Sequence, residues 1–492
     1  MTYDVAIIGG GVVGTAIARE LSRYHLDVAL LERDREVGFG TSKANSGIIH
    51  GGAHQDPDEL RGYYEWEGNQ RWGPLHEQLG FGFRRVGELV VAFDDKDVDH
   101  LHKLIEHGDQ KGVPGQELWD ADRVQREEPN TNPDIIAALW VPTAGVIDPY
   151  EATLLLAESA QRNGVALLTE HWVTDLSQDD EGLWTITTSA GEVGARFVIN
   201  AAGVFSDTIA KMAGANGFEI LPRKGEEFLL DKRLSGMVER IIFPCPTPTT
   251  KGILVIPTVS GTIMVGPTAE DVDDREDTST SPEGRAHVFE SVRRLVPGIS
   301  EKDMIASFAG LRAISSTKDF VFGPTDRKGF INVAGIQSPG LTSAPALAED
   351  TAKILADEGL TLREKDDFEP TLPHPVHFRE MPLEDKIRLA AEDPHFARLV
   401  CRCEIVTEAE ITDAIQRGSW TLDGVKFRTR AGMGRCQGGF CTWRVMELIA
   451  AERGIDITGV TKRGGDSWIV RPRVEEAPLD DEAATEQEEA TR

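Results

Sequence analysis

The feature that most constrains the fold of this chain is a glycine pattern placed between a strand and a helix. Residues Tyr3–Ile8 (YDVAII) have the apolar composition of a buried strand, and Gly9–Gly14 reads GGGVVG. Apolar residues at helical spacing follow from Thr15 to Tyr24, and Asp27–Glu32 (DVALLE) predicts a second strand. This order predicts a β-α-β unit at the start of an α/β fold.

The same pattern is typical of a dinucleotide site. Gly9 permits a tight turn, Gly11 lets backbone amides approach a pyrophosphate, and Gly14 allows the helix to pack closely on the strand. Glu32 ends the second strand, where a carboxylate accepts hydrogen bonds from ribose hydroxyls. The sequence holds no second unit of this kind, which favours one bound cofactor, and the hydroxyls and glycines of Thr41–Gly52 (TSKANSGIIHGG) favour a flavin.

Further segments extend the α/β pattern. Pro149–Arg162 predicts a helix, while Arg196–Ala202 and Gly329–Gly335 predict buried parallel strands. Strand-like alternation in Phe83–Phe93 and Glu227–Val265 indicates a sheet-rich module inserted between them. The predicted fold is therefore a Rossmann-like FAD-binding domain with an inserted, mainly β substrate domain, followed by a small helical C-terminal domain.

The chain composition divides these parts. Four prolines in Phe368–Pro382 mark a linker, and eight carboxylates after Val474 mark a solvated tail. We expect an oxidoreductase domain at 1–365 with its substrate part mainly at 81–145 and 221–305, a Pro-rich linker at 366–390, a metal-binding domain at 391–470 and an acidic, disordered tail at 471–492.

The charge balance excludes several classes of partner. The 492 residues carry a formal charge of -30, which repels nucleic acid and anionic lipid. The sequence shows no apolar run long enough to span a membrane and no basic leader, so we expect a cytoplasmic protein. An anionic substrate would need a local basic pocket.

Four of the five cysteines gather in the last fifth of the chain. They form Cys401-x-Cys403 and Cys436-x4-Cys441, while Cys245 stands alone as an idle thiol. Four thiolates hold either a [2Fe-2S] cluster or a structural zinc, and this spacing favours iron because zinc sites prefer C-x2-C or wider pairs. Disulfides are disfavoured in a cytoplasmic chain.

The motifs together resemble the FAD-dependent glycerol-3-phosphate dehydrogenases, above all the A subunit of the anaerobic enzyme. This group lies in the D-amino-acid-oxidase-like superfamily, which also holds L-2-hydroxyglutarate dehydrogenase. The resemblance covers about residues 1–360 and rests on GGGVVG with Glu32, TSKANSGIIHGG, NAAGVFSD (200–207), PRKGEEF (222–228), AGLR (309–312) and GIQSPGLTSAP (335–345). The C-terminal CRCEIVTEAEI and TRAGMGRCQGGFC are similar to the bacterioferritin-associated-ferredoxin-like [2Fe-2S] domain of the same subunits.

This resemblance implies the residues that contact FAD. They belong to the glycine motif, the acidic strand end, the segment after it and the later glycine-rich turns. The predicted set is Gly9, Gly11, Gly14, Glu32, Arg33, Thr41, Ser42, Asn45, Ser46, Val173 (through its backbone), Gly203, Gly340, Leu341 and Thr342.

The substrate pocket has fewer signals. The resemblance places Arg312 near the flavin, where a guanidinium suits a carboxylate or phosphate. Two histidines are candidates for handling protons: His50 is either the base or a flavin-side hydrogen-bonding residue, and His54 is the weaker candidate. Some relatives place an arginine soon after the paired glycines, whereas here the nearest is Arg61. Further candidate phosphate contacts are Arg223, Lys224 and Lys251.

The resemblance implies oxidation of sn-glycerol 3-phosphate to dihydroxyacetone phosphate. Electrons would leave through the cluster to a quinone, by way of a flavin-carrying subunit and an iron-sulfur membrane subunit, at the inner face of the cell membrane. Two alternatives stay open: oxidation of a 2-hydroxy acid or amino acid on the same scaffold, and an electron-transfer or iron-handling flavoprotein.

Overall fold

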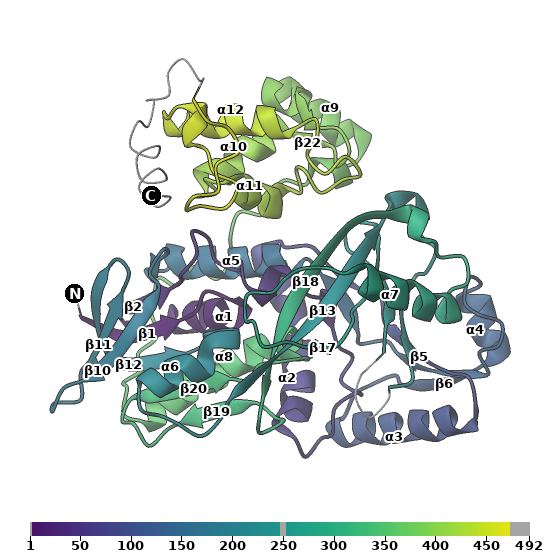
Figure 1. The fold of residues 1–492 in the computed structure, drawn as a ribbon, viewed down its shortest axis with the longest axis horizontal. Helices are drawn as coiled ribbons and strands as arrows, with labels where there is room; N and C mark the ends of the chain where they lie inside the picture. The colour runs from purple at the N-terminus through teal and green to yellow at the C-terminus, as the bar shows by residue number, and fades with distance from the viewer. Residues whose placement is uncertain (1, 247–251, 473–492) are drawn as a thin grey trace, which may run out of the picture. The chain divides into compact units, whose positions relative to one another are not determined.

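The computed structural model describes residues 2–246 and 252–472, and the chain divides into two compact units (Figure 1). The first unit comprises residues 1–376 and 434–437, and the second comprises residues 377–433 and 438–492. The second unit thus begins within the proline-rich segment. Most of the acidic tail, from residue 473, lies outside the described residues.

An eight-stranded sheet forms the nucleotide-binding half of the first unit. Its central strand pairs in parallel with strands on both sides, Val5 with Phe197 and with Val28, and its last four residues are buried. The strands are β1 (Thr2–Ile8), β2 (Val28–Leu31), β9 (Ala166–Leu168), β10 (Val173–Gln178), β11 (Trp184–Thr188), β12 (Gly191–Asn200), β19 (Val321–Pro324) and β20 (Phe330–Ala334).

Helices cover this sheet and share its apolar core. The central helix packs between two others, and Ile17 and Leu21 are fully buried there with Leu347. The helices of this half are α1 (Val12–Leu21), α2 (Leu60–Leu79), α5 (Pro149–Arg162), α6 (Ser206–Met212) and α8 (Gly340–Asp357). The predicted α/β fold is confirmed.

Helix α1 begins at Val12 rather than at the predicted Thr15, and it ends at Leu21 rather than Tyr24. Its N-cap is Gly11, which has no side chain to cap the helix. Instead, the Val12 backbone N–H donates to Oγ of Ser42, at 2.9 Å. The cap therefore comes from a residue thirty positions away, which no local helix-start signal reveals.

A nine-stranded, mostly antiparallel sheet forms the other half of the first unit. Its longest pair is β13–β18, in which Arg223 lies opposite Arg312. The strands are β5 (Glu88–Ala92), β6 (Glu117–Asp120), β7 (Ala137–Val141), β13 (Ile220–Leu230), β14 (Ile241–Pro244), β15 (Leu254–Pro257), β16 (Ile263–Gly266), β17 (Glu270–Asp271) and β18 (Met304–Ser315).

Three helices accompany the second sheet, so this half is not purely β. They are α3 (Asp95–Lys111), α4 (Ala121–Glu127) and α7 (Pro282–Leu295) (Figure 1). A three-stranded sheet of β3 (Ile48–Ile49), β8 (Gly145–Ile147) and β4 (Phe83–Arg85) adds a third sheet to the unit. The short 3-10 turn η1 (Thr41–Lys43) precedes β3 in the chain, and a second one, η2 (Gly203–Phe205), follows β12.

The second unit is small and mainly helical. A capping box starts α10, with Thr407 and Glu410 each bonding the other's backbone N–H, and Ile411, Val425 and Ile449 form its core. Its elements are α9 (Leu383–Glu392), β21 (Leu399–Cys401), β22 (Val406–Thr407), α10 (Glu408–Gln416), α11 (Leu422–Thr429) and α12 (Thr442–Arg453). Across the described parts of both units, no helix combines the length and apolarity needed to cross a membrane.

Candidate cofactor and substrate site

A cavity of about 870 Å³ lies in the first unit and is lined by residues of both large sheets, including Ile8 of β1 and Leu254 of β15. It is large enough for an organic cofactor together with a small substrate. Most of the predicted site residues line it: Gly9, Gly11, Glu32, Arg33, Thr41, Ser42, Asn45, Ser46, His50, Val173, Gly203, Arg312, Gly340 and Leu341.

The glycine motif forms a backbone cradle at one end of this cavity. Gly9 has a φ of +112°, and a Cβ there would lie 2.4 Å from the carbonyl oxygen of Ala201. A Cβ on Gly14 would lie 1.9 Å from the carbonyl oxygen of Gly9. Gly14 does not line the cavity, so its place in the structure is the close helix–strand packing that the motif requires.

Glu32 follows β2 and accepts hydrogen bonds from two backbone N–H groups, those of Gly10 at 2.7 Å and Asp34 at 2.9 Å. Burial raises the pKa of this carboxyl to about 7, although both hydrogen bonds act to lower it. The carboxylate therefore lies beside the backbone cradle, where its free lone pairs are positioned to accept further donors.

The segment from Thr41 to Ser46 is fixed by its own polar side chains. Thr41 Oγ1 donates to the carbonyl of Leu311, at 2.7 Å, and Asn45 Nδ2 donates to that of Ser42, at 2.8 Å. Thr342, which was also predicted to contact FAD, is fully buried and does not line the cavity. Its Oγ1 accepts a hydrogen bond from the backbone N–H of His50 at 3.0 Å.

Arg312 of β18 is the central cation of the substrate half. Its Nη2 donates to the carbonyl oxygen of Thr268 at 3.0 Å, and burial lowers the pKa of this guanidinium. Glu227 of β13 lies nearby, and its carboxylate accepts the hydroxyl of Ser46 at 2.5 Å. Burial raises the pKa of Glu227 to about 7, with Ser46 and Arg312 opposing the shift.

The other arginines of the cavity wall already hold carboxylates. Arg61 lies next to Glu59 and Asp319, and the rest form ion pairs of 3.1 Å or shorter: Arg33 with Glu276, Arg223 with Asp271 and Arg275 with Asp207. Lys224 pairs with Asp277 at 2.8 Å, and Lys251 lies outside the described residues. Among the described cavity-lining arginines, Arg312 is thus the one without an ion pair within 4.0 Å.

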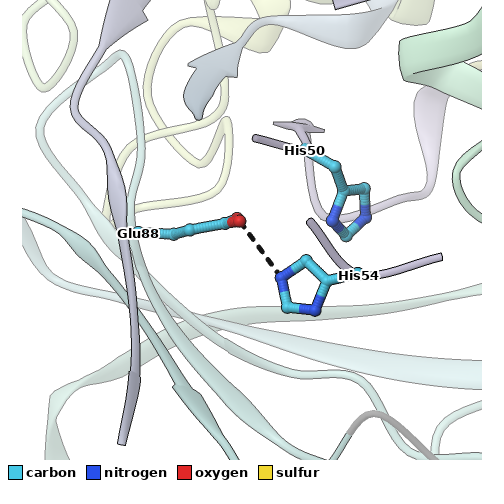
Figure 2. A group of neighbouring side chains, drawn as sticks. All are labelled: His50, His54 and Glu88. Carbon is cyan, nitrogen blue, oxygen red and sulfur yellow. Dashed lines mark ion pairs between the residues drawn. The ribbon is translucent and has the colours of Figure 1, made fainter. Parts of the chain in front are cut away.

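His50 and His54 both line the cavity, in the segment after β3. Their rings are edge to face, with centroids 5.4 Å apart, and Oγ of Ser338 lies 3.3 Å from Nε2 of His50. Figure 2 shows that His54 turns its Nε2 toward Glu88, at 3.1 Å from Oε1. The structure therefore joins the two histidines into one group, whereas the sequence treats them as separate candidates.

Several lining residues have no counterpart in the sequence prediction. Trp172, Phe205 and Arg275 border the nucleotide half, and Phe243 borders the substrate half. Trp172 and Phe205 adjoin predicted contacts, so their positions in the chain were a usable signal. Phe243 lies in β14 and Arg275 in the turn after β17, and nothing local in the sequence distinguishes them.

Three cysteines of the motif, Cys401, Cys403 and Cys441, pack in or against the core of the second unit, whereas Cys436 lies in residues 434–437, which group with the first unit. Cys401 and Cys441 are buried, and a hydrogen bond between their side chains lowers the pKa of the Cys401 thiol to about 6. Cys403 and Cys436 are half-buried. Cys245 is different: its thiol donates to the carbonyl of Asp97, and burial raises its pKa to about 12.

These residues fit the two predicted cofactors. The cavity has a bare backbone wall at the glycine cradle and a carboxylate beside it, which matches the pyrophosphate and ribose of a dinucleotide. A thiol that ionises below neutral pH suits a thiolate ligand of iron.

Comparisons with known proteins agree with this geometry. Residues 4–354 match the family described as FAD dependent oxidoreductase, and residues 399–451 match the BFD-like [2Fe-2S] binding domain. A glycerol 3-phosphate dehydrogenase of Caloramator mitchellensis is 43% identical, across 95% of this chain and 98% of the relative. An anaerobic glycerol-3-phosphate dehydrogenase subunit A1 of Haloferax volcanii is 29% identical, across 91% and 83%.

A solved structure extends the likeness to three dimensions. The L-alpha-glycerophosphate oxidase of Mycoplasma pneumoniae, with FAD bound, has a TM-score of 0.73 and 31% identity, covering 76% of this chain and all of that one. The chain therefore belongs to the FAD-dependent oxidoreductase family and carries a BFD-like [2Fe-2S]-binding domain in its C-terminal part.

Proposed function

We propose that this protein oxidises sn-glycerol 3-phosphate to dihydroxyacetone phosphate. The observation that carries the proposal is Arg312, a half-buried cation on the cavity wall that holds no carboxylate partner within 4.0 Å in the described structure. A guanidinium in that position binds a phosphate through paired donors. The names of the relatives, glycerol 3-phosphate dehydrogenase and glycerophosphate oxidase, favour the same substrate.

The chain's own residues have two tasks in this reaction. When bound, FAD takes the carbon-bound hydrogen as hydride, which converts the alcohol to a ketone, and a [2Fe-2S] cluster carries electrons one at a time. Arg312 binds the phosphate of the substrate and so would orient the alcohol carbon toward the flavin ring of bound FAD. His50 accepts the hydroxyl proton, since an imidazole is the side chain best suited to that task near neutral pH.

We assign the cofactor contacts to the predicted set. Gly11 gives its backbone N–H to the pyrophosphate, and Glu32 accepts the ribose hydroxyls. Gly9 contributes the tight turn, because its own N–H is donated to the carbonyl of Leu31 at 2.8 Å. The segment from Thr41 to Ser46 covers the cofactor. Cys401, Cys403, Cys436 and Cys441 hold the iron-sulfur cluster.

A cluster held by these cysteines would supply one-electron transfer out of the chain, and the acceptor we propose is a quinone, reached by way of partner subunits. The Haloferax volcanii relative is named as a subunit, which supports an assembly of this kind. We place the protein in the cytoplasm, at the inner face of the membrane where such partners would sit.

Cys441→Ser tests the role of the cluster. This variant should lose the absorbance of the cluster and turnover with a quinone, while substrate should still reduce its flavin. Cys245→Ser is the control and should change neither property.

The substrate assignment is tested by flavin bleaching in the absence of oxygen. Purified protein is mixed with sn-glycerol 3-phosphate, L-2-hydroxyglutarate, glycine and L-proline, and the rate of bleaching is followed for each. We expect bleaching by glycerol 3-phosphate at least about 100-fold faster than by the others, which corresponds to about 3 kcal/mol of difference in transition-state binding. Faster bleaching by a hydroxy acid or amino acid would overturn the assignment.

A further inference from the structure

Glu88 occupies an unusual place for a glutamate. It begins β5, whose five residues are all buried, and its side chain is 0% exposed. Neither carboxylate oxygen has a hydrogen-bond partner in the described structure. A Cβ on Gly51 would lie 2.9 Å from Oε1 of Glu88, so the chain after β3 closes tightly over the carboxylate. A buried polar residue that breaks the pattern of its strand usually marks a functional site.

One imidazole lies next to the Glu88 carboxylate, although the two groups are not in hydrogen-bond geometry. Nε2 of His54 lies 3.1 Å from Oε1, and the His54 side chain is only 3% exposed (Figure 2). No lysine or arginine among the described residues forms an ion pair with Glu88 within 4.0 Å. A buried carboxylate without a partner is strongly unfavourable, and among the described residues His54 is the one basic side chain within 4.0 Å of Glu88.

The groups that face this pair come from each element packed around it. His50 lies edge to face with His54 in the same segment, and β14 contributes the uncharged ring of Phe243, 4.7 Å from that of His54. Helix α3 contributes His100, whose pKa is lowered by burial first and by His54 second. Asp97 and Lys103 also act on the pKa of His100, in opposite directions, and Glu88 is the carboxylate that contacts His54.

We propose that Glu88 and His54 form a carboxylate–imidazole pair that positions His50 and sets its strength as a base. Glu88 fixes the proton on Nε2 of His54, and the oriented ring stabilises the positive charge that develops on His50 when the substrate hydroxyl loses its proton. This is the general arrangement of a base oriented by a third, buried group. The inference rests on the proposed function only in naming which proton is moved.

The first test is the pH profile of flavin reduction by substrate in wild type, Glu88→Gln and His54→Asn. Removing the negative charge of Glu88 disfavours protonation of the nearby imidazoles, so His50 remains in its neutral form, which is active as a base, down to lower pH. We expect the acid limb of the Glu88→Gln profile to move about one pH unit lower, and the plateau to fall about tenfold because the base is weaker. His54→Asn should lower the plateau at least as much.

The matched control is Glu128→Gln. Glu128 is also a buried glutamate, but it pairs with Arg240 and does not line the cavity. Its profile should overlay that of wild type. If Glu128→Gln and Glu88→Gln lower the rate alike without moving the acid limb, the effect is structural and the proposal is wrong. A stoichiometric divalent metal in wild type, absent from Glu88→Gln, would also overturn it, since the three side chains would then be ligands.

A second measurement needs no substrate. Nitrogen-15 spectra of histidine-labelled protein report which ring nitrogen carries the proton, and His54→Asn identifies the signal. We expect the proton of neutral His54 on Nε2, and a proton on Nδ1 would contradict the proposal. If glycerol 3-phosphate fails to reduce the flavin, the proposed function fails, while the nitrogen spectra still decide the role of Glu88.

Discussion

The two ends of the cavity are built in different ways. The end that we assign to the nucleotide is lined by backbone at Gly9 and Gly11 and by one carboxylate at Glu32, all within the first 32 residues. The substrate end is made of side chains from the second sheet and the segment after β3, with Arg312 as its cation. Recognition by backbone requires glycines at fixed spacing and so leaves a local motif, whereas recognition by side chains depends on which distant residues the topology brings together.

The largest effect is expected from a change at the nucleotide end. In Gly14→Val the new side chain meets the carbonyl of Gly9, where even a Cβ would lie at 1.9 Å, so α1 must separate from β1. We expect loss of bound FAD, measured as flavin absorbance per chain after gel filtration. Gly298→Ala is the control, because it does not line the cavity and a Cβ there would lie at an ordinary 3.6 Å from Met237. Normal FAD content in Gly14→Val would break the distinction between the two ends.

The substrate end should respond differently. Arg312→Met removes the unpaired cation but touches no backbone of the cradle, so FAD content should stay normal while kcat/KM falls by about 100-fold or more. Arg223→Met is the matched control, because its charge is already held by Asp271. An equal loss in both variants would mean that Arg312 has no special role in binding the substrate.

A pH-dependent stability effect is expected at Glu227. Its folded-state pKa of about 7 lies above the usual 4.5, so ionisation destabilises the fold as pH rises between those values. The free energy of unfolding of Glu227→Gln, relative to that of wild type, should therefore increase by about 1–3 kcal/mol between pH 4.5 and 7.5. Urea unfolding at several pH values measures this difference. A difference that does not change with pH would show that Glu227 stays ionised in the folded protein.

The smallest effect is expected at Ser42, whose hydroxyl caps α1 from a distance. Ser42→Ala should cost about 1 kcal/mol of stability, as loss of an N-cap usually does. Ser42→Thr keeps the hydroxyl and serves as control in the same unfolding experiment. A neutral Ser42→Ala would show that water caps the helix equally well.

The sequence predicts those parts of the fold and of the site that depend on contiguous residues, and it does not predict those that depend on distant residues meeting in the fold. The β-α-β unit was predictable because strand, glycines and helix are contiguous, and α5 was predicted with its bounds because Asn163-Gly164 ends it. The predicted start of α1 at Thr15 was wrong because the side chain that caps the helix belongs to Ser42, thirty positions away. The His54–Glu88 pair was not predictable from the sequence, because the two residues are 34 positions apart. They meet only because the segment after β3 folds over β5.

The most direct test is an anaerobic titration of the purified protein with sn-glycerol 3-phosphate, followed by flavin absorbance and by the electron paramagnetic resonance of the cluster. The account predicts that substrate bleaches the flavin and that a reduced [2Fe-2S] signal then appears in the same chain. An unbleached flavin, or a protein whose cysteines hold zinc and give no signal, would contradict it.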